Sequence, residues 1–193
     1  MAAVRDEKSL VEVHDRATWH AWLEANHATS TGVWLVRWRP RTGRPTLDYE
    51  DAIEEALCFG WVDGTVGTLD DERGTSYFSP RKPRSGWAAT NKARVERLIA
   101  AGLMMPAGLA AIERAKANGA WELLDGAERM EVPDDLAAAL ADRPPAASNF
   151  AAFPPGARKQ MLAWVAFAQR PETRAARIAQ IAESAARNVR ARG

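Results

Sequence analysis

The sequence contains very little cysteine and no long apolar run. Cys58 is the only cysteine among 193 residues, so the chain can form neither an internal disulfide nor a zinc site built from several cysteines. No window approaches the ~18 apolar residues of a membrane span. Residues 1–10 carry four charged side chains and no apolar stretch, so we expect no signal peptide there. These absences favour a cytoplasmic protein that does not span the membrane.

Nucleotide-binding and catalytic signatures are also missing. The sequence has no Walker loop, no G-x-G-x-x-G, no H-E-x-x-H and no G-x-S-x-G. His14, His20 and His27 are the only histidines, and the last two lie two helical turns apart, about 10.5 Å along the axis. That separation is too long for one metal ion. We therefore expect three surface histidines, no metal and no cofactor, and the sequence leaves open whether the protein is an enzyme.

The net charge of +1 conceals an uneven distribution. Residues 155–193 contain eight basic and two acidic side chains, a net charge of 8 − 2 = +6, which leaves 1 − 6 = −5 for the rest of the chain. A basic tail can indicate nucleic-acid binding. However, its arginines are spaced apart and no aromatic residue follows Phe167, so a solvated helix face explains them better. We therefore do not favour a nucleic-acid partner.

Three segments are rich in the β-branched and aromatic residues typical of strands. They are residues 33–38, 61–68 and 75–79. A polar turn at 70–74 separates the second and third segments, so these two should form an antiparallel hairpin. We expect the first segment to join the same antiparallel sheet.

Helices are predicted before, within and after this set of strands. Residues 16–27 place apolar side chains at helical spacing, and Asp48 is a suitable N-cap for a helix that Gly60 ends. From Ser85 onward the pattern is helical, and Ser85 should cap a helix that carries Trp87. Prolines should begin several later helices, at Pro106, Pro133, Pro155 and Pro171.

The expected fold class is therefore α+β: a small antiparallel sheet with N-terminal helices, followed by an all-helical C-terminal part. We place the α+β domain in residues 1–125 and the helical region in residues 126–193. A chain of this length can bury a sizeable core without disulfides or metals.

Side chains suited to chemistry are concentrated between residues 58 and 91. Alternation along a strand would place Trp61, Asp63 and Thr65 on one face. Prolines stiffen the segment 79–85, whose cations precede a predicted helix start, where free backbone N–H groups attract anions. The candidate ligand-binding residues are Trp61, Asp63, Tyr77, Arg81, Lys82, Ser85, Trp87 and Asn91.

This region has more than one interpretation. Asp63 could pair with Arg81 while the tryptophans fill the core, or Arg81 could face an open pocket. A desolvated Asp63 could also act as a general base. In either of the first two cases we predict that Trp61, Asp63, Arg81 and Trp87 form one cluster. Cys58 lies at the negative end of its predicted helix, so we expect a buried and unreactive thiol.

Several stretches match the pattern of a known family. They include residues 32–35, 55–64, 78–83, 95–99, 106–108 and 172–174. With them the chain resembles the YdeI/OmpD-associated family, often labelled bacteriocin-protection proteins, from about Trp19 to Ile181. Gly86 and Ala88 depart from the pattern, since a polar residue and a serine are expected there. The resemblance implies a bacterial cytoplasmic protein with an N-terminal α+β part and a C-terminal helical part, and it brings no established catalytic residues.

The function we expect is the binding of a small anionic or peptidic ligand. Arg81 and Lys82 would contact the anion, and Trp61 and Trp87 would form the walls of the pocket. The alternatives are an enzyme that uses Asp63 as general base, and a protein or nucleic-acid partner bound through the basic C-terminal helices. The sequence does not identify the ligand or show whether a bacteriocin is involved. It is compatible with a homo-oligomer.

Overall fold

The computed structural model describes residues 10–191, which form two compact units. The first unit contains residues 10–85 and 90–118, and the second contains residues 86–89 and 119–191. The α+β class expected from the sequence is confirmed. The predicted absence of a signal peptide concerns residues 1–10, and all of these except Leu10 lie outside the described residues.

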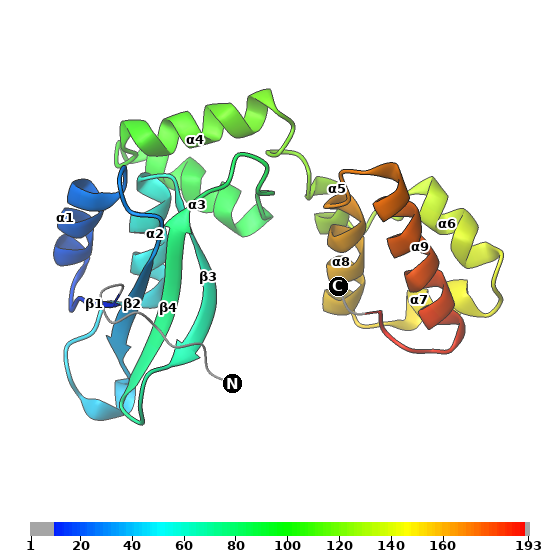
Figure 1. Ribbon diagram of the computed structural model, residues 1–193, viewed down its shortest axis with the longest axis horizontal. Coiled ribbons are helices and arrows are strands. Elements are labelled where there is room, and N and C mark those ends of the chain that lie inside the picture. The colour runs from blue at the N-terminus through cyan, green and yellow to red at the C-terminus, as the bar shows by residue number, and fades with distance from the viewer. Residues whose placement is uncertain (1–9, 192–193) are drawn as a thin grey trace. The chain divides into compact units, whose positions relative to one another are not determined.

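A four-stranded sheet forms the centre of the first unit (Figure 1). Its strands lie in the order β1 (Leu10–Glu12), β2 (Val33–Trp38), β4 (Arg73–Pro80) and β3 (Trp61–Thr68). The three predicted strands and their antiparallel pairing are confirmed. The sheet as a whole is mixed, because β1 runs parallel to β2. Strand β1 was not predicted, since three residues are too few to show alternation.

Two helices cover one face of this sheet. Helix α1 (Arg16–Asn26) packs against α2 (Tyr49–Cys58), and α2 packs against β3. The side chain of Asp48 accepts a hydrogen bond from the backbone N–H of Glu50, which caps α2 as predicted. Gly60 follows the end of α2 with φ = +73°, a conformation that glycine adopts without strain.

The next two helices are α3 (Ala89–Ala100) and α4 (Pro106–Ala117). The prediction that Ser85 caps a helix containing Trp87 is wrong, because both residues precede α3. The backbone N–H of Ser85 instead donates to the carbonyl oxygen of Lys82 and closes a turn. The free helix N-terminus expected beside the cations of segment 79–85 is therefore not formed at Ser85.

Buried tryptophans organise the core of the first unit. The ring of Trp19 is fully buried and packs edge-on against Phe78, with 5.5 Å between the ring centroids. Its indole N–H donates to the carbonyl oxygen of Ala52 at 3.1 Å, and that of Trp61 donates to His27 at 3.2 Å. Because both donors are satisfied, these large rings are buried without an unpaired polar group.

The second unit is helical. Its described helices are α5 (Asp125–Glu128), α6 (Asp134–Ala141), α7 (Ala146–Ala152), α8 (Pro155–Ala166) and α9 (Pro171–Ala186). Their apolar sides share one core that includes Leu136, Phe150, Val165 and Ile181. The proline starts of α8 and α9 are confirmed, whereas the short α5 and α7 lack a clear apolar period and were not predicted. None of the described helices combines the length and apolar character that crossing a bilayer requires.

Candidate functional site

Strand β2 places an arginine on the sheet face that the helices cover. Val33 and Leu35 are buried on this face, and alternation puts Arg37 beside them. The guanidinium of Arg37 is partly buried, and its Nη2 donates to the hydroxyl of Ser76 at 3.3 Å. It also lies 4.7 Å from the ring centroid of Tyr49, a cation–π contact. A charged group thus extends from the sheet toward the first turn of α2.

Arg37 has no carboxylate partner among residues 10–191. Its Nε is buried without a hydrogen-bond partner there. Burial lowers the pKa of the guanidinium, and the nearby Tyr49 and Asp48 only partly oppose this. Since arginine stays protonated at neutral pH, the site holds a partly desolvated cation with a donor left unused. An incoming anion would satisfy both the charge and the donor.

Tyr49 connects Arg37 to a carboxylate. Its hydroxyl donates to Oδ2 of Asp63 at 2.8 Å, and Asp63 lies on β3 opposite Phe78 of β4. Burial, followed by the hydrogen bond to Asp63, raises the pKa of Tyr49 to about 12. Tyr49 is therefore a neutral donor at physiological pH. We call Arg37, Tyr49, Asp63 and Ser76 the Arg37 cluster.

Two further arginines act electrostatically on Asp63. Arg81, directly after β4, is only 7% exposed, and burial lowers the pKa of its guanidinium to about 10 although Asp63 opposes the shift. Arg94 of α3 binds both carboxylate oxygens of Glu50 at 2.6 Å. It also donates to Oδ1 of Asn91 at 2.7 Å. The charge of Asp63 acts on the guanidinium groups of both Arg81 and Arg94, so the Arg37 cluster has cations on more than one side chain near it.

The structure brings together only some of the predicted site residues. Asp63 belongs to the Arg37 cluster, Arg81 acts on it through charge, and Asn91 binds Arg94. Trp61 is instead a core residue, 1% exposed, whose indole contacts Trp22 at 5.8 Å between ring centroids. Asp63 and Trp61 do share a face, as predicted. A β-bulge between Asp63 and Val66 interrupts the alternation before Thr65.

Other predicted residues lie elsewhere. Tyr77 sits between Ser76 and Phe78 on β4, so it points to the opposite face of the sheet, where its ring lies 5.1 Å from that of Trp34. Lys82 is exposed, and Ser85 lies in the turn after β4. Trp87 belongs to the second unit, and its ring lies 5.0 Å from Trp121. The cluster expected from Trp61 to Trp87 is therefore divided between the two units.

A second polar cluster lies between α1 and α2, and its side chains pair with one another. Arg16 donates through Nε to Glu55 at 2.5 Å and through Nη1 to Asp51 and Glu54, each at 3.1 Å. Nδ1 of His20 lies 2.7 Å from the same Glu55 carboxylate. We call these five residues the Arg16 cluster. Its mutual pairing indicates a role in stability.

The histidine and cysteine predictions have mixed outcomes. His20 and His27 are not simple surface residues, because both are partly buried and each ring lies 5.1 Å from that of Phe59. Cys58 is buried as predicted. Its thiol pKa is raised to about 12, first by burial and then by Glu55. Residues 10–191 hold no group of three His, Cys, Asp or Glu side chains placed to bind a metal ion.

Comparison with known proteins gives two matches to family models. Residues 11–111, slightly more than half of the chain, match a family described as Domain of unknown function (DUF8412). Residues 129–188 match the family described as Bacteriocin-protection, YdeI or OmpD-Associated, which confirms the predicted resemblance through the C-terminal helices. No curated protein and no solved structure matches the chain. The chain therefore belongs to the DUF8412 family and carries a YdeI/OmpD-associated segment in its second unit.

Proposed function

We propose that the first unit binds a small ligand with a carboxylate or phosphate group, and that Arg37 is its main anchor. The observation that carries this proposal is the partly buried Arg37 guanidinium, which has no carboxylate partner and an unused Nε donor within residues 10–191. Charge-assisted hydrogen bonds to such an anion are about twice as strong as neutral ones. The Tyr49 ring and the Ser76 hydroxyl beside Arg37 would limit how the anion can lie.

Asp63 supports a further restriction on the ligand. Its carboxylate lies at the hydroxyl end of Tyr49, whereas Arg37 lies over the ring of the same residue. A ligand would therefore meet a cation and an anion separated by about one tyrosine side chain. An amino acid or a short peptide carries a carboxylate and an ammonium group that suit this order. Peptidic ligands thus fit better than inorganic anions alone.

The alternative is an enzyme that uses Asp63 as general base. One observation favours it: Asp63 is only partly buried, and Tyr49 fixes its orientation through one oxygen. A base needs such fixed geometry. The substitution Asp63→Asn keeps the shape and removes the basic oxygen. If the unmodified protein turns over a substrate and Asp63→Asn still binds it without turnover, the enzyme is favoured. If the unmodified protein binds the ligand without any turnover, the binding module is favoured.

Calorimetric titration tests the proposal directly. We expect some members of a set of dipeptides to bind the unmodified chain. Each of these should bind Arg37→Met at least about tenfold more weakly. That loss corresponds to one hydrogen-bonded charge pair, about 1.5–3 kcal/mol. Arg41→Met is the matched control, because Arg41 is an exposed arginine outside the cluster. If both variants lost the same ligand affinity, the effect would come from the net charge of the chain and not from Arg37. That result would contradict the proposal.

The cellular role proposed here follows from the same site. A single buried cysteine suits a reducing compartment, which supports a cytoplasmic location. The match over residues 129–188 suggests a part in bacteriocin protection, exerted through ligand binding. Cells expressing Arg37→Met should then be less protected than cells expressing Arg41→Met at equal protein levels. If the two variants protected cells equally, bacteriocin protection would not depend on the Arg37 site.

A further inference from the structure

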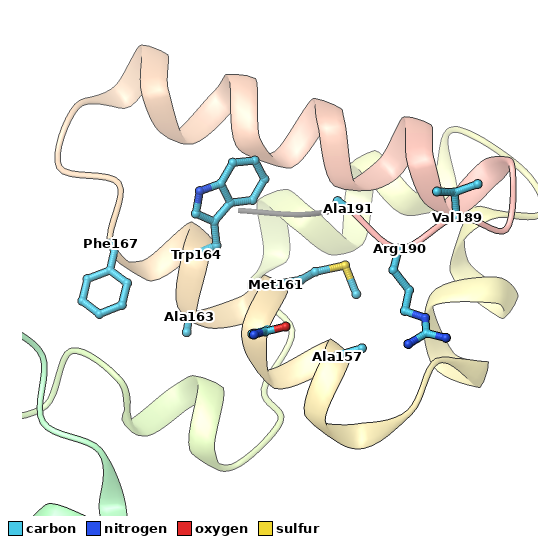
Figure 2. Close-up of a pocket in the computed structure, with 9 residues that line it drawn as sticks. Ala157, Met161, Ala163, Trp164, Phe167, Val189, Arg190 and Ala191 are labelled. Carbon is cyan, nitrogen blue, oxygen red and sulfur yellow. The ribbon is translucent and has the colours of Figure 1, made fainter. Parts of the chain in front are cut away.

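The second unit carries an open groove of about 810 Å³ (Figure 2). One wall is α8, which contributes Ala157, Met161 and Trp164 at helical spacing. The other wall is the irregular segment at residues 189–191, which follows α9. This volume lies within the range of about 300–1,000 Å³ typical of ligand sites. The residues that line the groove all belong to the second unit, whereas the Arg37 cluster belongs to the first.

The walls of the groove are mostly apolar. Phe167 and Val189 line it with 43% and 53% of their surface exposed, so large apolar side chains face solvent there. Trp164 is held in place by Arg177, whose Nη1 donates to the Trp164 carbonyl at 2.5 Å and whose guanidinium lies 5.1 Å from the indole centroid. A fixed apolar wall in water favours an occupant that brings apolar side chains of its own.

The groove is lined by one basic residue, Arg190, and the described residues that line it include no acidic one. Arg190 makes no ion pair within residues 10–191. Arg190 itself lines the groove, and Figure 2 shows its side chain extending from the C-terminal segment beside Ala157 and Met161. An occupant with negative charge would complement this surface.

We propose that this groove binds an acidic peptide segment that carries bulky apolar side chains. The apolar side chains would pack against Trp164, Met161 and Phe167, and a carboxylate of the peptide would pair with Arg190. Nucleic acid fits less well, because its affinity depends on several cations along the backbone and Arg190 is the one basic residue among those lining this groove. The proposal does not depend on the ligand of the first unit.

Calorimetric titration of the full chain with a defined peptide tests this. The probe is acetyl-Asp-Leu-Phe-Glu-amide, and the control probes replace both acids by lysine or both apolar residues by glycine. We expect only the first to bind well. Arg190→Glu should weaken its binding by about tenfold or more, since a charge pair becomes a repulsion. Arg170→Glu is the matched control, as this exposed arginine carries the same charge outside the groove, and it should bind within about twofold of the unmodified chain.

Several outcomes would overturn the proposal. The proposal would be contradicted if Arg190→Glu, folded as shown by an unchanged circular dichroism spectrum, bound the peptide as tightly as Arg170→Glu does. Saturation by dodecanoate or by a single-stranded oligonucleotide, with no response to the peptide, would assign the groove to another class of ligand. A concentration-dependent dimer that Arg190→Glu disrupts would assign it to a second copy of the chain. Repeating the titrations in the Arg37→Met background weakens any binding of the peptide by the first unit. The loss caused by Arg190→Glu should persist there, so the two proposed sites can fail independently.

Discussion

Arg16 and Arg37 belong to the same unit and differ in what surrounds them. Arg16 bonds to three carboxylates of α2, one of which, Glu55, is only 6% exposed. Arg37 contacts the hydroxyl of Ser76 and the ring of Tyr49, both neutral. The same kind of side chain is therefore paired with carboxylates in one place and has only neutral contacts in the other. The first arrangement stabilises the fold, whereas the second costs desolvation that a bound anion would offset.

The largest expected effect concerns Arg16. Arg16→Met would leave Glu55 buried with His20 as its remaining partner and would remove bonds to Asp51 and Glu54. Breaking a buried pair costs about 3–5 kcal/mol, and the loss here should fall somewhat below this because Arg16 is one-third exposed. Urea unfolding measures the change. A loss under about 1 kcal/mol would remove the structural role given to the Arg16 cluster.

The next effect concerns Tyr49 and high pH. The pKa of Tyr49 is raised from 10.0 to about 12, so the folded state holds this proton more tightly than the unfolded state. Its contribution is complete below pH 10 and is lost as the pH rises toward 12. Cys58 adds a slope of the same sign. Urea unfolding between pH 9 and 11 should therefore show a shallower decline in Tyr49→Phe than in the unmodified chain. Identical slopes would contradict the raised pKa that burial and the hydrogen bond to Asp63 give Tyr49.

The rate of thiol labelling at Cys58 tests the packing of α2 near Arg16 and needs no substitution. Burial and the nearby Glu55 raise the pKa of its thiol to about 12, and the side chain is 1% exposed. Only thiolate reacts quickly, so labelling by a thiol reagent should be slow in the native protein and fast in urea. Rapid stoichiometric labelling of native protein would show that α2 opens readily and that the packing described here is wrong.

The smallest expected effect on stability is that of Arg37. Arg37→Met removes a partly buried charge and keeps an unbranched side chain of similar length, so the free energy of unfolding should stay unchanged or rise by up to about 1 kcal/mol. The result would contrast with that for Arg16→Met in the same assay. A loss similar to that of Arg16→Met would make Arg37 a structural residue and erase the difference between the two clusters.

Local chemistry explains why much of the fold was predictable. Asp48 as the N-cap of α2 and Gly60 as the residue that ends it depend on neighbouring residues, and both were identified from the sequence. The proline starts at Pro155 and Pro171 depend equally on local backbone constraints. By contrast, β1 gains its structure from pairing with β2, and a segment of three residues carries no pattern that reveals this.

The candidate site was only partly predictable, because its contacts are distant in sequence. Asp63 was chosen for its place on a strand, yet its hydrogen bond comes from Tyr49 on a preceding helix. Arg37 was missed although a signal was present: alternation from Val33 and Leu35 puts this arginine on the core-facing side of β2. Tyr77 was included because it lies in the segment 58–91 where side chains suited to chemistry are concentrated, but strand alternation places it on the other face.

The most direct measurement follows the arginine Nε–H resonances by NMR during titration with a dipeptide, and with acetate as a simpler probe. The Nε of Arg37 is buried without a partner, whereas that of Arg16 already donates to Glu55. Assignment by Arg37→Met and Arg16→Met identifies the two signals. We predict a saturable downfield shift for the Arg37 signal and none for the Arg16 signal. An Arg37 signal that stays unchanged at saturating anion, or equal shifts of both signals, would contradict an anion site at Arg37.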